Sequence, residues 1–245
     1  MNKLKIKIIT LGHIPITLNK NKILSWKSEL FELVHPIDEY PVTADSDLYG
    51  WQYSDTLISS LLPDFDNADF LFAITSLPLE DNWYSRRLSN NRVVFTLHEI
   101  KNILSSENIP LENAVYRVIY AYCLGFIRNG KKIPLYNNGL SFTHDETKGC
   151  LFDMNGVKSD ITESCNKPII CDSCFNKLAE NKVPKNTIEL TRKEIKKIRK
   201  QFYYRVSDYV KSNPIKAFTY SVFFALFLGA LGSIIGSILF EIIFK

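Results

Sequence analysis

The stretch AFTYSVFFALFLGALGSIIGSILF, residues 217–240, contains twenty-four residues and no charged side chain. As an α-helix that rises about 1.5 Å per residue it would reach about 36 Å, more than the roughly 30 Å of a bilayer's hydrocarbon core. A hairpin of two spans would need about forty apolar residues. The sequence therefore predicts one transmembrane helix, residues 217–244, and disfavours a buried helix of a soluble core.

The charges that flank this helix predict its orientation. Between Arg192 and Lys216 there are nine basic and two acidic residues, a net charge of +7, whereas the far side has Glu241 and Lys245. Basic flanks stay on the cytoplasmic side of a membrane. We therefore expect a single-pass protein of the inner (cytoplasmic) membrane whose N-terminal domain lies in the cytoplasm.

The segment before the span, residues 186–213, is predicted to form a basic amphipathic connecting helix. Within it, Thr191 has the pattern of an N-cap, with Glu194 three residues later. Such a helix either lies against anionic headgroups or stays solvated, and the sequence leaves both alternatives open. In the first case, the expected headgroup contacts are Lys193, Lys196, Lys197, Arg199 and Lys200.

Residues 1–191 carry a net charge of −3, because the chain total is +4, the basic flank contributes +7, and Glu241 and Lys245 cancel. A nucleic-acid-binding surface would need cations spread over a folded face. We therefore expect no nucleic-acid partner.

Short apolar or β-branched runs alternate with helical patterns in the first half of the chain. The predicted strands are Lys5–Leu11, Phe70–Thr75 and Arg92–Leu97. The predicted helices are Lys22–Val34, Asp55–Leu62, His98–Ser105 and Leu111–Phe126. Strands separated by helices predict an α/β domain with a mixed sheet, which we place at residues 1–180.

Residues 142–178 contain four of the five cysteines. The CxxC spacing of Cys171 and Cys174 lets both thiolates bind one tetrahedral Zn²⁺, and zinc is favoured over free thiols. A thioredoxin-like redox role is disfavoured because the pair does not follow a strand in a βαβ pattern. Cys165 is a competing ligand. The predicted ligands of this structural zinc are His144, Cys150, Cys171 and Cys174.

A series of motifs follows a recognisable order along the chain: Asn82-Trp83, the run NRVVFTL at 91–97, YCLGF at 122–126, then Cys150, Met154, Lys158 and the CxxC. This order resembles the archaemetzincins, a family of metzincin-like zinc peptidases with a Cys-rich zinc site after the catalytic histidines. The resemblance covers residues 1–178. It implies a metzincin-like mixed sheet, of the α/β (α+β) class, with a zinc-bound Cys-rich subregion.

The departures from the family pattern bear on activity. That pattern has His-Glu-x-x-His on the helix before Leu124-Gly125 and a third histidine after the glycine. At these positions the chain has Val118, Ile119, Tyr122 and Arg128. The imidazole ligands and the carboxylate that would activate water are therefore missing. The resemblance, with these departures, predicts no catalytic residues in this chain. It also implies that His144 stands where the family has a cysteine zinc ligand, and that Met154 occupies the position of the turn methionine.

Two further patterns in the sequence bear on function. His98-Glu99 is half of a zincin motif, but Asn102 replaces the second histidine, so a surface or capping role is favoured. Small residues recur along one side of the predicted span, and such a face lets helix backbones approach closely. Self-association is favoured over ordinary use of small residues, and the predicted face is Ala225, Gly229, Gly232, Ser233, Gly236 and Ser237.

Two functions of different classes follow. The first is a non-catalytic, membrane-anchored effector or scaffold that senses a protein partner or signal in the cytoplasm and acts through an oligomerising helix. Architectural analogy places it in prokaryotic antiviral defence. The alternative is an active membrane-anchored zinc peptidase or other hydrolase that uses His98 and Glu99 with ligands from elsewhere, and it predicts a second zinc per chain.

Overall fold

A computed structural model describes residues 2–135 and 143–244. The chain divides into two units, Met1–Arg199 and Lys200–Lys245. The first unit therefore extends beyond the predicted domain, which ended at residue 180. Lys245, which entered the predicted orientation of the span, lies outside the described residues.

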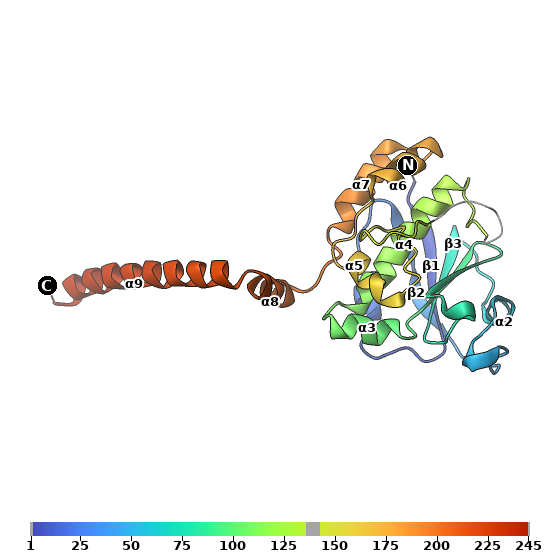
Figure 1. Cartoon of the computed structure of the whole chain (residues 1–245), viewed down its shortest axis with the longest axis horizontal. Coiled ribbons are helices and arrows are strands. Elements are labelled where there is room, and N and C mark those ends of the chain that lie inside the picture. The colour runs from blue at the N-terminus through green and yellow to red at the C-terminus, as the bar shows by residue number, and fades with distance from the viewer. Residues whose placement is uncertain (1, 136–142, 245) are drawn as a thin grey trace. The chain divides into compact units, whose positions relative to one another are not determined.

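The first unit is built on a mixed sheet of five strands in the order β2-β1-β3-β5-β4 (Figure 1). The strands are β1 (Leu4–Leu11), β2 (Phe31–Tyr40), β3 (Phe70–Thr75), β4 (Ser85–Leu88) and β5 (Arg92–Thr96). Neighbours are parallel except for β4, which pairs antiparallel with β5. The predicted mixed sheet is confirmed, and its three predicted strands are β1, β3 and β5.

The predicted helix Lys22–Val34 is wrong. Helix α1 spans only Lys20–Leu24, and the chain then enters β2 at Phe31. The register pairs Phe31 with Leu4 and Val34 with Lys7, so sheet pairing overrides the local helical spacing.

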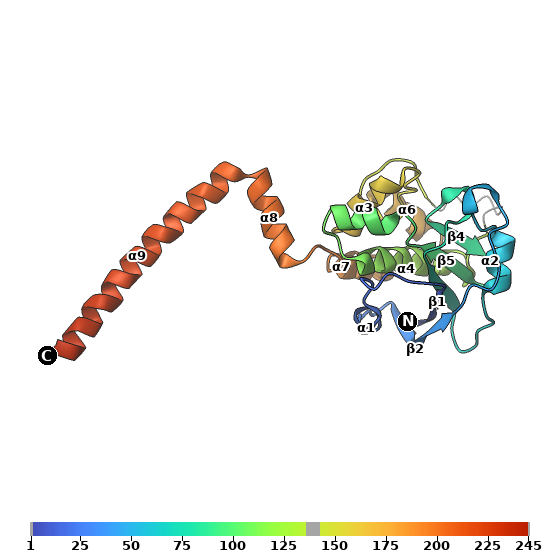
Figure 2. The same cartoon turned by 90° about the horizontal axis from the view of Figure 1, so that it is seen from below.

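Helices cover both faces of the sheet. On one face α3 (Ile100–Ser106) and α4 (Leu111–Arg128) pack on a core to which β1 contributes Ile6 and Ile8. On the other face α2 (Asp55–Leu61) packs against Ile9 and Leu11. Figures 1 and 2 show α2 and α4 on opposite sides of the strands. Every residue of β3 is buried, as expected for a central strand covered on both faces.

The remaining helices of the first unit add to the α4 side of the core. They are α5 (Ile161–Cys165), α6 (Asp172–Glu180) and α7 (Lys185–Ile195), and single 3₁₀ turns lie at Tyr49–Trp51, Glu80–Asn82 and Lys158–Asp160. These helices bring residues after 143 back against α4.

The predicted connecting helix, residues 186–213, is wrong. These residues do not form one helix, because α7 ends at Ile195 and α8 begins at Phe202. Thr191 lies inside α7 and is buried, so it is no N-cap. Glu194 is buried as well, and its carboxylate accepts 2.7 Å hydrogen bonds from the Ser28 and Tyr120 hydroxyls. The first half of the predicted helix therefore belongs to the folded domain.

The second unit consists of α8 (Phe202–Ser212) and α9 (Pro214–Phe244). Pro214 has no N–H to continue α8, but its fixed φ suits the first position of a new helix. Among the described residues, α9 is the one helix long and apolar enough to cross a membrane, with 31 residues and an 18-residue window whose mean hydropathy is 2.3. A Cβ added at Gly229, Gly232 or Gly236 would meet no atom within 4 Å.

Candidate metal centre and adjacent cavity

Four side chains that could hold a metal ion converge between the loop after residue 143 and α6. Their ligand atoms all lie within 4.8 Å of one another, and they belong to His144, Cys150, Cys171 and Cys174. Cys171 is the N-cap of α6, and Cys174 lies in the first turn of that helix. Isolated bridges from Cys150 to Ile169 and from His144 to Asp153 tie the segments together.

Gly149 permits the turn that presents Cys150. Its φ is +69°, and an added Cβ would lie 3.2 Å from the backbone oxygen of Glu163. A larger residue would therefore be both strained and crowded at this position.

The structure brings together the four side chains that the sequence predicted as ligands. Cys165, the competing ligand, is fully buried on α5 and lies outside the cluster. Burial raises the pKa of Cys165 to about 12, so it remains a thiol at neutral pH. Its backbone oxygen accepts a 2.9 Å hydrogen bond from the Asn113 amide.

A hydrogen bond to the backbone orients the imidazole of His144. His144 Nδ1 lies 2.9 Å from the backbone oxygen of Glu146, so Nδ1 carries the hydrogen and donates it. Nε2 then keeps its lone pair, and this atom lies 3.6 Å from the Cys171 sulfur. The imidazole is thus held in the tautomer that binds a metal through Nε2.

The hydrogen bonds around Cys150 favour the thiolate form of its side chain. Its sulfur accepts hydrogen bonds from the backbone N–H groups of Cys171, at 3.4 Å, and Phe152, at 3.5 Å. Together with a hydrogen bond from the Cys174 thiol, which has the largest effect, these outweigh burial and lower the pKa of Cys150 to about 5. The thiolate is the form of cysteine that binds metals.

Asp153 lies beside the cluster and supports the fit of a cation. Its Oδ2 accepts hydrogen bonds from the backbone N–H groups of Cys150, at 2.8 Å, and Lys148, at 3.1 Å. Its Oδ1 is buried without a hydrogen-bond partner and lies 3.6 Å from His144 Nε2. A buried carboxylate oxygen left unsatisfied beside three thiols and an imidazole is what a site for a soft divalent cation would show.

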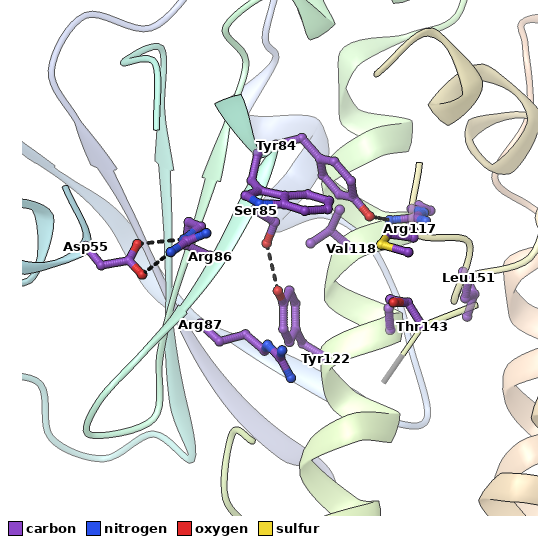
Figure 3. A pocket seen from close by; sticks show the side chains of 13 residues that line it. Asp55, Tyr84, Ser85, Arg86, Arg87, Arg117, Val118, Tyr122, Thr143 and Leu151 are labelled. Atoms are coloured by element: carbon purple, nitrogen blue, oxygen red, sulfur yellow. Dashed lines mark hydrogen bonds and ion pairs between the residues drawn. The ribbon is translucent and has the colours of Figure 1, made fainter. Parts of the chain in front are cut away.

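A cavity of about 460 Å³ opens next to this cluster (Figure 3). Val118 and Tyr122, one turn apart on α4, line it together with Met154. The resemblance drawn from the sequence implies that these are the positions of two metal-binding histidines and of the turn methionine. Ile119, which the same resemblance places at the glutamate, is fully buried in the core.

Three arginines line the cavity: Arg86 and Arg87 from β4 and Arg117 from α4. Arg86 donates to the carboxylate of Asp55 through Nε, at 2.8 Å, and Nη2, at 2.6 Å. Arg117 is 2% exposed. It donates to Ser164 Oγ at 3.0 Å and to Tyr84 Oη and the Asp153 backbone oxygen at 2.9 Å.

Hydroxyl groups complete the polar wall. The hydroxyls of Ser85 and Tyr122 lie 2.8 Å apart (Figure 3). Burial raises the pKa of Tyr122 to about 12, although the Ser85 hydrogen bond and the charge of Arg87 act against it. The phenol therefore stays neutral at physiological pH and can donate a hydrogen bond.

The sequence interpretation named Val118, Tyr122 and Met154, but it did not single out the arginines of this cavity. The signals were two adjacent arginines after Trp83-Tyr84 and Arg117 as a lone cation inside an apolar helix. Asp153 gave no sequence signal, because an aspartate in a polar loop is common.

The other predicted sites are placed as follows. Glu99 is exposed and pairs with Lys158 at 3.0 Å. In residues 2–135 and 143–244, His98 and Glu99 belong to no group of three potential metal ligands. Among the predicted headgroup contacts, Lys200 is mostly buried and pairs with Asp208 at 2.9 Å. The others are exposed: Lys193, Lys196, Lys197 and Arg199.

The chain is similar in fold to solved archaemetzincins. Archaemetzincin from Methanopyrus kandleri is 16% identical, with 73% of this chain and 95% of that chain covered and a TM-score of 0.43. Archaemetzincin from Archaeoglobus fulgidus complexed with malonate is 17% identical, with 71% of this chain and 99% of that chain covered and a TM-score of 0.38. No family model and no curated protein matches the sequence. These likenesses agree with the predicted archaemetzincin-like fold, and no activity transfers from them.

Proposed function

We propose that this protein is a non-catalytic, membrane-anchored effector or scaffold with a structural zinc. Its cytoplasmic domain binds a partner or signal, and its C-terminal helix anchors and oligomerises it. The composition of the metal cluster carries the proposal. Four protein side chains supply four donor atoms, so a tetrahedral Zn²⁺ would have no open position for water or substrate.

The adjacent cavity supports a binding role. Val118 and Tyr122 line it where a peptidase of the resembling family would hold its catalytic metal. The charged groups in its wall are mainly arginines, which recognise carboxylates and phosphates and do not bind zinc. A concave site of this kind favours binding over hydrolysis.

The second unit supports a membrane anchor. Helix α9 has the length and hydropathy of a span. The basic residues before it favour a cytoplasmic N-terminal domain, and exposed Lys193, Lys196, Lys197 and Arg199 are available to anionic headgroups. The small-residue face supports self-association. Crosslinking of the full chain in native membranes checks this part, and a monomer would contradict it.

Metal analysis and a cleavage assay on the purified full chain test the non-catalytic role. We expect one zinc per chain and no cleavage of a peptide library. A second zinc, or cleavage that Glu99→Gln abolishes while the exposed control Glu107→Gln retains it, would instead establish a hydrolase. Antiviral defence stays a prediction, which phage plating on cells that carry the gene and its neighbours would check.

A further inference from the structure

We propose that the arginine-lined cavity binds a small organic anion, with a phosphate or carboxylate group on a compact apolar body. The inference rests on the proposed function in one respect, because the anion would be the signal that the cytoplasmic domain senses. The site itself is argued from the geometry of β4, α4 and the loop that carries Leu151 and Met154 (Figure 3).

The size and lining of the cavity suit a small molecule. Its volume of about 460 Å³ lies within the range of about 300–1,000 Å³ that is typical of ligand sites. Apolar and aromatic side chains supply part of the wall: Trp83 from the segment before β4, Val118 from α4, and Leu151 and Met154 from the loop. This part would accommodate the body of the ligand.

The charges of the cavity select an anion. Its described lining has three arginines against one carboxylate, that of Asp55, a net charge of +2. The bidentate ion pair with Asp55 compensates Arg86. The lining keeps a net positive charge to which buried Arg117 contributes, and low-dielectric walls strengthen the resulting potential. The guanidinium fork matches the geometry of carboxylate and phosphate oxygens.

Arg117 is the strongest single observation. It is 2% exposed, and its three hydrogen-bond acceptors are two hydroxyls and a backbone oxygen, all of them neutral. The Asp153 carboxylate acts on Arg117 only through space, because Oδ2 is occupied by backbone N–H groups and Oδ1 faces His144. Buried charges are ordinarily paired. An anion in the cavity would supply the missing counter-charge.

Arg117 also has donors to spare. A guanidinium has five N–H groups, and within residues 2–135 and 143–244 three of those of Arg117 are used, which leaves two. Beside it, the neutral phenol of Tyr122 and the hydroxyl of Ser85 offer further hydrogen bonds within the same lining. An uncharged apolar ligand would offer no acceptor to the buried guanidinium of Arg117, so the chemistry of the wall disfavours it.

Calorimetric titration of the full chain in detergent, at low salt, tests the site with phenyl phosphate, benzoate and the neutral phenol. We expect one or both anions to bind, and phenol to bind at least about tenfold more weakly. The affinity of the anion should fall as salt rises. Phenyl phosphate alone would identify a phosphate monoester as the ligand class, and benzoate alone a carboxylate.

Variants localise the binding. Arg87→Gln should lower the anion affinity at least about tenfold, because it removes a charged hydrogen-bond donor. The matched control is Arg92→Gln on β5, which makes the same charge change outside the described lining. It should leave the affinity within about twofold, as expected for a partly exposed, screened charge outside the lining. Val118→Phe, which fills the cavity without altering its charges, should abolish binding.

The outcomes separate this inference from the proposed function. If neither anion binds, or if Arg87→Gln and Val118→Phe both retain the full affinity, the inference is overturned. Unchanged zinc content and melting temperature in these variants show that they are folded. A chain that cleaves peptides yet binds the anion as described would refute the non-catalytic role and leave this site standing.

Discussion

The metal cluster and the arginine-lined cavity are neighbours of opposite chemistry. The cluster contains soft donor atoms that suit a cation, whereas the cavity contains guanidinium groups that suit an anion. Asp153 joins them, because its carboxylate accepts from Cys150 while its backbone oxygen accepts from Arg117. Under the proposed function, a metal in the cluster would serve the architecture of the domain and would hold one wall of the cavity.

The largest expected effect is that of breaking the cluster. Cys174→Ser should release the zinc, because the remaining three ligands no longer close the tetrahedron. Structural zinc contributes several kcal/mol to folding, so the melting temperature should fall by about 10 °C or more. Metal analysis and thermal unfolding of the purified chain measure both effects.

Cys165→Ala is the matched control for this prediction. It removes a buried thiol of the same segment that lies outside the cluster. It should keep the zinc and cost only about 1 kcal/mol through the small void it leaves. A Cys174→Ser protein that retained one zinc would show that the cluster is not the metal site.

Asp153→Asn should separate the two sites. The amide retains one oxygen for the N–H groups of Cys150 and Lys148, but it removes the negative charge beside His144. Loss of a carboxylate that contacts the metal ligands lowers metal affinity about 10- to 100-fold, which competition with a chelator measures. Arg117 bonds to the backbone oxygen of this residue, so anion affinity should change less.

Asp160→Asn provides the control, because Asp160 accepts a hydrogen bond from the Thr147 hydroxyl at 3.1 Å and is not part of the described ligand cluster. It should leave metal affinity unchanged. Equal losses of metal and anion affinity in Asp153→Asn would mean that the cluster and the cavity form one coupled site.

The cluster could be predicted from the sequence because its chemistry is local. Its four ligands lie within residues 144–174, and CxxC spacing alone fixes two of them. The same holds for β1, β3 and β5, which are short buried apolar runs that periodicity detects. Local signals of this kind carry enough information without knowledge of the fold.

The cavity could not be predicted because tertiary pairing creates it. The four residues of β4 are largely polar, and they become a strand only by pairing Arg87 with Val93 and Leu88 with Arg92 of β5. Arg117 then meets this strand through the hydroxyl of Tyr84. The misassigned β2 has the same cause, since its pairing with β1 is absent from any local pattern.

The smallest expected effect concerns the charge balance of the cavity. Asp55→Asn removes the one carboxylate in the described lining and raises its net charge from +2 to +3. Asp55 is partly exposed, so solvent screens its effect, and anion affinity should rise only about threefold. The same change weakens the ion pair with Arg86 and the first turn of α2, which costs about 1 kcal/mol.

Asp81→Asn, at 3.7 Å from Arg86 but outside the described lining, should raise the affinity less. Because Asp55→Asn destabilises the domain slightly while strengthening binding, calorimetry that found weaker binding would show that Asp55 positions Arg86 for the ligand rather than opposing the anion.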